Sequence, residues 1–420
     1  MTFSMKTASA IGAVLLASGL TAQGTLAATV APQLGRAVPT FLVKPPSAYV
    51  QARIQANLGQ GLRVSPAGVS TIPYWTTTIT SPLDGKAYTY SMVGGSPYSG
   101  SLGPTTISYV PIVLKIHLRL GRSFVVVDPT KTSHCDTQSA STRFFNSPLF
   151  QPVGSLVSNG VNVAATPGGQ QLLSAFQRAN FWTSVQGSNY GVTLVPTRTT
   201  PIVVDWTPSL NSPRALTLSD NCGGTFPIAE VDINDLDTEL QKIATAYALP
   251  NQIPMTLVAD TAIYQGNYNN CCILGYHNAI PSGTNGVQVY AVGAYFTQST
   301  VFGPHFSDIT VWTHEMAEMF DDPFVQSIAS VPGGVNNALT PAWGHVGQVT
   351  GCQNNLEAGD PLTPDQGGNY PNYPITGVGG FTYHYQDLPF HDWFYRTAST
   401  STGGKYSFVG NFASVQGVCV

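Results

Sequence analysis

The residues best suited to chemistry lie together in the second half of the chain, in residues 313–323. His314 is followed directly by Glu315, and Glu318 comes one helical turn after His314. In a helix, side chains four residues apart lie on the same face, and an imidazole and a carboxylate are both ordinary zinc ligands. The spacing therefore predicts a metal site on a helix.

The order of these residues is that of the H-E-x-x-H motif of zinc peptidases, with Glu318 in the place of the second histidine. In that motif two ligands one turn apart hold the metal, and the glutamate after the first histidine is the general base. By this comparison His314 and Glu318 are candidate metal ligands, and Glu315 is the candidate catalytic base. Asp322, at the end of the segment, is a candidate for orienting His314 or for holding the helix end.

A helix is predicted here because apolar residues recur at steps of three and four, namely Ile309, Trp312, Met316 and Phe320. Ser307 or Asp308 can cap the start of this helix, and Pro323 ends it. The charged residues fall on the face opposite the apolar one, which is also typical of a solvated acidic surface with one ordinary histidine. Acidic residues near a helix C-terminus oppose the helix dipole, and this mismatch favours the metal site.

A third ligand is expected from the chain that follows the helix. Glu357 and Asp360 come after a stretch rich in Gly and Asn, and either could complete a site with His314 and Glu318, leaving one position for water. One imidazole with two or three carboxylates is a harder set than the usual zinc ligands, so calcium and manganese are alternatives to zinc. A plain polar surface turn explains Glu357 and Asp360 equally well.

Two histidines outside this segment could take part in the same site. His277 lies in a turn-rich stretch before the predicted helix and could be a ligand, or a partner that polarises a bound carbonyl. His391 could do the same, with the neighbouring Asp392 fixing its tautomer. Both histidines are also compatible with a purely structural, hydrogen-bonded role. A serine triad is less supported, because the chain has no G-x-S-x-G sequence.

A family resemblance is carried by three motifs. They are the run H-E-x-x-E-x-x-x-D-P that begins at His314, the E-x-G-D sequence that begins at Glu357, and residues 272–279. In these motifs the chain resembles secreted zincin-like bacterial proteins of poorly characterised function. It is similar, less closely, to plant phosphate-induced or Exordium-type extracellular proteins, which carry a comparable S-H-E-x-x-E segment. The resemblance covers residues 108–420.

The resemblance implies a secreted protein with a metallopeptidase-like centre at His314, Glu315 and Glu318. It also implies that Glu357 or Asp360 joins this centre. Two departures bear on activity: a threonine precedes the motif where serine is common, and the second histidine of the peptidase helix is missing.

The rest of the pattern predicts an α+β fold with two lobes. Residues 71–228 contain strand-like runs separated by Gly and Pro turns, which indicates a β-rich N-terminal lobe. Residues 229–420 follow the order helix, strand, strand, helix, which suits a zincin-like lobe whose mixed sheet backs the H-E-x-x-E helix. Residues 383–395 are rich in aromatic residues and histidine, which is compatible with a substrate cleft or with ordinary packing.

The N-terminus indicates export. Residues 1–27 have the order of a secretory signal, with basic Lys6, an apolar core at 11–20 and small residues at the end. A membrane anchor would need about 20 consecutive apolar residues, so we expect no membrane span. Residues 28–70 are rich in Ala, Pro and Gln and are expected to form a linker or a propeptide.

Composition agrees with an extracellular or periplasmic protein. Only 9% of the residues are charged, the net charge is -4, and Lys and Arg form no cluster, which argues against nucleic acid as a partner. The six cysteines allow up to three disulfides, and they are Cys135, Cys222, Cys271, Cys272, Cys352 and Cys419. The adjacent pair is expected to bond to different partners, because a bridge between neighbours is geometrically demanding.

These observations lead to a first hypothesis of a secreted, metal-dependent hydrolase, a peptidase of the zincin type that acts on peptides or proteins. Zinc is the expected cofactor, with calcium or manganese as alternatives. The competing hypothesis is a non-catalytic extracellular binding or cell-surface protein that contacts a surface polymer and holds a structural metal or none.

Overall fold

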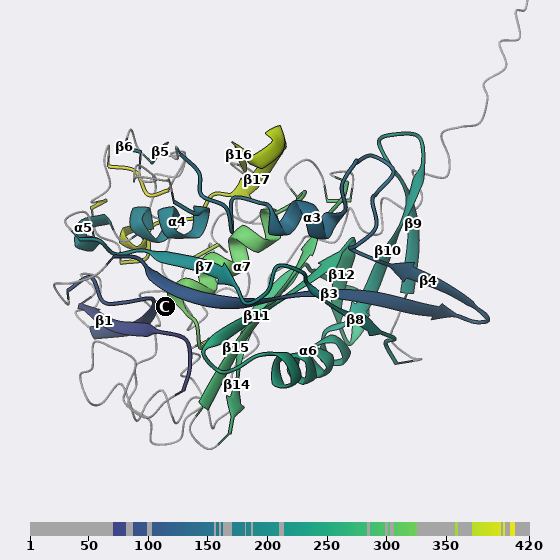
Figure 1. Ribbon diagram of the computed structural model, residues 1–420, viewed down its shortest axis with the longest axis horizontal. Helices are drawn as coiled ribbons and strands as arrows, with labels where there is room; N and C mark the ends of the chain where they lie inside the picture. Colours follow the sequence, from purple (N-terminus) through teal and green to yellow (C-terminus); the bar gives the residue numbers. More distant parts are fainter. Residues whose placement is uncertain are drawn as a thin grey trace, which may run out of the picture.

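The computed structural model describes residues 70–80, 87–98, 103–154, 157–158, 161–162, 170–180, 182–185, 188–209, 214–283, 286–298, 301–302, 306–325, 358–359, 372–395, 398–399 and 404–407. The expected export signal (1–27) and all of the expected linker except Ser70 lie outside these residues. So do the candidate ligands Glu357 and Asp360. The described helices and strands form an α+β structure that is rich in strands (Figure 1).

The central element is a seven-stranded mixed sheet. Its main order is β14-β15-β11-β3-β4, and β7 and β8 also pair with β3. The long strand β3 is parallel to β11, β7 and β8 and antiparallel to β4, while β15 is parallel to β11 and antiparallel to β14. The bounds are Thr105–Leu120 for β3, Ser123–Val127 for β4, Val192–Pro196 for β7, Ile202–Trp206 for β8, Gln252–Ala259 for β11, Gly275–Ser282 for β14 and Gly286–Tyr295 for β15. The mixed sheet expected from the sequence is therefore present.

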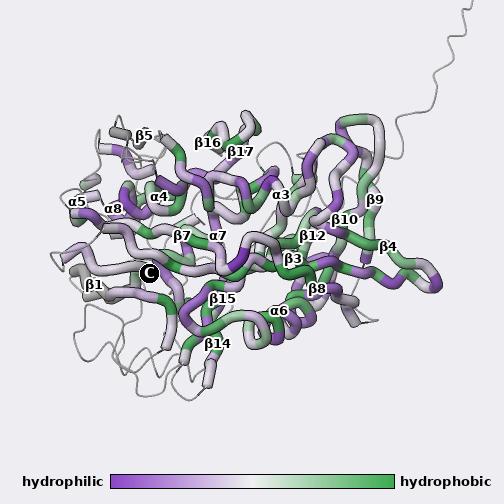
Figure 2. Tube along the Cα trace, in the orientation of Figure 1, coloured by the Kyte–Doolittle hydropathy of each residue, from purple (hydrophilic) through white to green (hydrophobic). Residues whose placement is uncertain are grey.

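The burial of side chains along strand β3 follows its sequence pattern. Its middle, around Val110 to Leu114, is apolar and buried without a break, as expected for a strand covered on both faces. Toward its end the pattern alternates, with Ile116 and Leu118 buried and His117 partly exposed. In Figure 2 the turn between β3 and β4 is coloured as hydrophilic, whereas apolar residues lie along β4 and the neighbouring part of β3.

A second sheet has the order β13-β12-β10-β9. Its strands are Arg214–Ser219 (β9), Thr225–Asp232 (β10), Thr261–Gln265 (β12) and Asn267–Ile273 (β13). The lobe boundary expected at residue 228 falls inside β10. Moreover, β3 and β11, which lie on either side of that boundary, are hydrogen-bonded to each other in the first sheet. The two expected lobes therefore share one sheet.

Helices lie on both faces of the seven-stranded sheet. In Figure 1, α6 (Ile233–Tyr247) lies on one face, and α7 (Thr310–Asp321) lies on the other, with α3 (Ala140–Phe145) and α4 (Leu172–Asn180) on the same side. Helix α6 begins where the Asp232 carboxylate accepts a hydrogen bond from the Asn234 amide, an ordinary N-cap. The remaining elements are β1 (Tyr74–Thr80), β2 (Ala87–Val93), β5 (Val157–Ser158), β6 (Val161–Asn162), α5 (Trp182–Val185), β16 (Asn372–Thr376), η3 (Val378–Gly380), β17 (Thr382–Gln386) and α8 (His391–Tyr395).

Two disulfides are present in the described part of the chain. One joins Cys135 to Cys222, whose Cα atoms are 5.6 Å apart and which are separated by 87 residues in sequence. The other joins Cys271 to Cys272, so the expectation that these neighbours bond to different partners was wrong. Both lie toward the end of β13, and the other two described cysteines, Cys135 and Cys222, are bonded to each other. None of the helices in the described residues is long and apolar enough to cross a membrane.

The chain passes from one sheet to the other at Asp260, between β11 and β12. This residue is buried in the left-handed region of backbone conformation (φ 39°), and its carboxylate accepts hydrogen bonds from the amide and the hydroxyl of Thr297. Burial raises the pKa of Asp260 from 3.8 to about 7, although the bonds from Thr297 act in the opposite direction. The junction is thus best accommodated with Asp260 protonated.

This raised pKa predicts how stability depends on pH. The stability that the protonated carboxyl contributes is fully present below about pH 4, the unfolded-state value, and is lost as the pH rises toward about 7. The full loss corresponds to about 4 kcal/mol. Asp260→Asn keeps an oxygen for the Thr297 amide and cannot ionise, so the variant should become more stable than the wild type as the pH rises from 4.5 to 7.5. Urea unfolding of both proteins across this range measures the difference, and parallel pH curves would contradict the prediction.

Candidate metal centre

Helix α7 carries the motif and is buried on all sides. Every residue from Thr310 to Asp321 is buried, the acidic ones included. The helix packs against β14 and β15 of the sheet and against β17, β2 and α4. The alternative of a solvated acidic surface is therefore wrong for this helix, because the expected apolar stripe and the expected charged face both lie inside the protein.

Both ends of α7 lie close to where the sequence places them. The helix ends at Asp321, and its C-cap Asp322 stands directly before Pro323, as predicted. At the start, the N-cap is Ile309 and makes no side-chain capping bond. The carboxylate of Asp308, one residue earlier, instead accepts hydrogen bonds from the backbone amides of Ile309 and His384. Asp308 thus joins the helix start to β17.

Two glycines of the sheet allow α7 to lie close to it. A Cβ atom on Gly293 of β15 would lie 2.8 Å from the ring of Trp312. A Cβ atom on Gly275 of β14 would lie 2.8 Å from Cγ of Glu315 and 2.8 Å from Cγ1 of Val311. Real Cβ atoms do not approach other atoms so closely, so these positions need glycine for steric reasons.

Strand alternation places His277 on the α7 side of the sheet. Successive side chains of a strand point to opposite faces. On β14 the hydroxyl of Tyr276 contacts Asp237 of α6 at 3.2 Å, whereas His277, the next residue, lies 3.5 Å from Glu315 of α7. His277, which the sequence offered only as an additional candidate, is therefore brought into the motif by the sheet.

Three potential ligands converge in this region. One ligand atom each from His277, Glu315 and Glu318 can be chosen so that all lie within 4.8 Å of one another. Nδ1 of His277 and Oε2 of Glu315 are 3.5 Å apart, so a cation held by His277 would lie beside the Glu315 carboxylate. The cluster therefore has the size that a metal site requires.

The tautomer of His277 is set by its surroundings. Its Nε2 atom lies 3.2 Å from the backbone carbonyl of Asp322, an acceptor, so Nε2 carries the proton. In a neutral ring Nδ1 then presents its lone pair toward Glu315. Burial lowers the pKa of His277 to about 3, so the ring is neutral at pH 7. The backbone carbonyl of Asp322 thus orients His277, whereas the sequence led us to expect Asp322 to orient His314 or to hold the helix end.

His314 repeats this arrangement with different partners. Its Nδ1 atom lies 3.2 Å from Oε1 of Gln386, and the Gln386 amide is oriented by its other end, which donates to the carbonyl of Gly359 at 2.9 Å. Nδ1 of His314 is therefore the donor, and Nε2 faces Oε1 of Glu318 at 3.0 Å. Burial also lowers the pKa of His314 to about 3.

Two histidine–glutamate pairs result, His277 with Glu315 and His314 with Glu318. In each pair a neutral histidine turns an acceptor nitrogen toward a carboxylate oxygen, which is also an acceptor. Two acceptors at such distances need a proton or a cation between them. A neutral imidazole with its second nitrogen held by a protein acceptor is the form in which histidine binds metals. The donor set therefore fits a divalent cation, whose charge would balance the two carboxylates.

The segment expected to provide a third ligand reaches this centre. The amide of Gly359 donates to Oε1 of Glu318 at 2.9 Å, and a Cβ atom at Gly359 would lie 2.2 Å from Nδ1 of His314. Glu357 and Asp360 themselves lie outside the described residues. Gln386 and Gly359 carry no sequence signal that would have marked them, because their roles depend on β17 and on this segment meeting α7.

His391, the other candidate histidine, belongs to a separate polar cluster. Its ring lies 3.3 Å from Asp321, at the end of α7. The same carboxylate accepts hydrogen bonds from the side-chain amides of Gln177 and Asn180 of α4. The cluster ties α4 and α8 to α7, which is a structural role.

Comparison with protein-family models, with curated proteins and with solved structures gives no match for this chain. The roles of these residues are therefore argued from geometry and chemistry alone.

The close approach at Gly275 provides a test of the centre's packing. We expect Gly275→Ala to push Glu315 and the middle of α7 away from β14 and to destabilise the protein by about 1–3 kcal/mol, the usual cost of overpacking. Gly103→Ala is the matched control, because a Cβ atom there meets nothing within 4 Å. Thermal and urea unfolding of the two variants measure the effect, and equal stability of both would show that α7 does not pack against Gly275 in solution.

Proposed function

We propose that the protein is an exported, metal-dependent hydrolase whose centre consists of His277, His314, Glu315 and Glu318. The observation that supports this most is the hydrogen bonding of the two histidines. Each donates one ring N–H to a protein acceptor and turns its other nitrogen toward a glutamate. This is the general arrangement of histidines that bind metals.

Zinc is the cation we propose first, because two imidazoles and a carboxylate are a common set in catalytic zinc sites. The second carboxylate makes the set harder, so manganese and calcium remain the alternatives. Glu357 and Asp360 are further candidate ligands, since Gly359 contacts both His314 and Glu318.

The chemistry we propose is hydrolysis of a peptide bond, as in peptidases with the related H-E-x-x-H helix. A divalent cation in such a site lowers the pKa of a bound water to about 7. In this chain His277, His314 and Glu318 would hold the cation, and Glu315 would accept the proton of the attacking water. Export is supported by the signal-like sequence at residues 1–27 and by the two disulfides.

A second candidate function is favoured by the depth of the centre. The side chains of the two histidines and two glutamates are at most 2% exposed. A centre without access for a substrate would hold a structural cation, in a non-catalytic extracellular protein that binds a partner or a cell-surface polymer. The two functions differ in whether the cation supports turnover or only stability.

Metal content of the purified, exported protein tests the centre. We expect about one equivalent of a divalent cation in the wild type and loss of most of it in His277→Ala, because that variant removes one ligand of few. His117→Ala is the matched control. His117 is also paired with a carboxylate, since its Nε2 atom lies 2.6 Å from Oδ1 of Asp205, but it is not part of the centre. Inductively coupled plasma mass spectrometry on the three proteins identifies the metal. A wild type without metal, or equal content in all three proteins, would contradict the proposal.

Turnover separates the two functions. Glu315→Gln should keep the metal and lower the rate of peptide-library cleavage by about 10²–10⁴-fold, the usual contribution of a general base. If the wild type holds metal but cleaves no peptide, and a chelator lowers only its melting temperature, the structural alternative is correct. Full activity in Glu315→Gln would show that Glu315 is not the base.

A further inference from the structure

A surface cavity of about 750 Å³ lies at the N-terminal end of α7, outside the metal centre. Its walls come from the segment before α3, the loop that contains Cys222, the end of β15 and the strand β17. The disulfide between Cys135 and Cys222 joins two of these walls. A volume of this size is typical of sites for small molecules.

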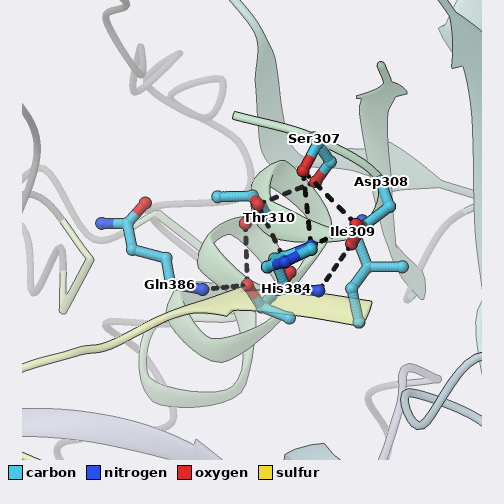
Figure 3. A network of polar contacts seen from close by, with 7 residues as sticks. Ser307, Asp308, Ile309, Thr310, His384 and Gln386 are labelled. Atoms are coloured by element: carbon cyan, nitrogen blue, oxygen red, sulfur yellow. Dashed lines mark hydrogen bonds and ion pairs between the residues drawn. The ribbon is translucent and has the colours of Figure 1, made fainter. Parts of the chain in front are cut away.

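One histidine in this cavity is held in a defined orientation. Asp308 accepts a hydrogen bond from Nδ1 of His384 at 2.8 Å through one carboxylate oxygen, and from the His384 backbone amide at 2.8 Å through the other (Figure 3). The Asp308 side chain is 6% exposed and that of His384 is 36% exposed. The carboxylate is thus built into the protein and the ring is accessible. With Nδ1 bound to Asp308, Nε2 is the nitrogen that can contact a ligand.

The arrangement is not that of a serine hydrolase. In a Ser-His-Asp triad the carboxylate and the serine contact different ring nitrogens. Here Oγ of Ser307 lies 3.5 Å from Nδ1 of His384, the same nitrogen that contacts Asp308 (Figure 3). Ser307 is therefore not placed for activation by this histidine, and the geometry favours binding over nucleophilic catalysis.

The charges in the cavity are paired with one another. Arg143 donates to Asp136 from both Nε and Nη2, with a shortest distance of 2.7 Å, and its guanidinium lies over the ring of Phe381 at 4.1 Å. Asp308 is paired with His384. The hydrogen bond to Asp308 raises the pKa of His384 and so favours its protonated form, in which the charges of the described lining balance. This argues against strongly anionic or cationic ligands.

The rest of the polar lining consists of amides and hydroxyls. The amides belong to Gln138, Asn221 and Gln298, and hydroxyls come from residues such as Thr137, Thr297 and Thr382. Amides and hydroxyls can each donate and accept hydrogen bonds, as sugar hydroxyls also do. At the end of β15 that lines the cavity, Tyr295 pairs with β11 and Phe296 forms a bridge with Asp308, so the backbone of these two residues is already paired within the protein and is not an open edge for an added peptide strand.

We propose that this cavity binds an uncharged saccharide, with Nε2 of His384 as a central hydrogen-bonding atom and Asp308 as the residue that positions the ring. Gln138, at the exposed rim, provides a further contact. The site is independent of the metal centre, although β17 carries both His384 and Gln386 and Asp308 lies two residues before α7.

Binding of defined neutral sugars tests the proposal. The wild-type protein is titrated with maltotriose, cellotriose, xylotriose and N-acetylated chitotriose, and separately with the blocked peptide N-acetyl-Ala-Ala-Ala-amide, by calorimetry and saturation-transfer NMR. We expect at least one sugar to bind, and His384→Gln and Gln138→Ala each to weaken that binding at least tenfold.

His117→Gln is the matched control, because His117 also pairs with an aspartate and its side chain is 30% exposed, but it does not line the cavity. This variant should bind the sugar like the wild type. All variants should keep the wild-type metal content and melting temperature, which separates failure of this site from failure of the metal centre or of folding. Gln138→Ala tests the cavity even if His384→Gln is unstable.

The proposal is overturned if none of the four sugars binds, or if binding is unchanged in both His384→Gln and Gln138→Ala. Binding of the blocked peptide in place of the sugars would show that the cavity accepts a peptide, and this outcome overturns the saccharide assignment.

Discussion

The structure depends on the burial of a helix that carries both apolar and ionisable groups. Helix α7 is enclosed by β14, β15, β17, β2 and α4, so that its apolar stripe and its acidic residues are equally removed from water. Burying apolar side chains is favourable, at about 25 cal/mol per Å². Burying carboxylates is unfavourable unless they are paired, hydrogen-bonded or bound to a metal. The residues around α7 provide such partners for its buried carboxylates.

The buried carboxylates of the helix are stabilised in two different ways. Asp321 is surrounded by the amides of Gln177 and Asn180 and by His391, a set that satisfies a carboxylate without a cation. Glu315 and Glu318 instead face histidines whose pKa is lowered by burial and whose remaining ring nitrogens are already engaged as donors. The first set is sufficient by itself. The second set is better suited to a centre that holds a cation, and this difference is the reason why we propose the metal centre beside Glu315 and Glu318 and not at Asp321.

The helix also connects regions with different exposure. Its middle is in the buried centre, and its start adjoins the surface cavity through Asp308 and His384. Strand β17 makes the same connection, because His384 lines the cavity and Gln386, two residues later, contacts His314. Residues two apart on a strand share one face, so a single short strand supports both places.

Much of the local structure follows from sequence pattern. The spacing of Ile309, Trp312, Met316 and Phe320 predicts the helix, and Pro323 its end, and both are confirmed. The mixed sheet and the α+β class are also confirmed. Strand β3 contains both patterns that predict strands, a continuous apolar run in its middle and an alternating run toward its end. Local periodicity is sufficient for these features because each depends on residues a few positions apart.

The solvation of the helix could not be read from its own sequence. An amphipathic pattern predicts one face in water, but contacts with distant strands covered that face. The bond between Cys271 and Cys272 was also missed, because the choice of partner depends on which cysteines the fold leaves close together.

The sequence alone thus determined that an imidazole and two carboxylates would share one helix, because helical spacing requires only local order. Only the tertiary structure decided which groups they meet. The alternation of β14 brought in His277, the pairing of distant strands brought in Gln386, and a glycine made room for the chain at residue 359. These contacts join residues 38 to 72 positions apart, and no periodicity of the chain encodes distances of that kind.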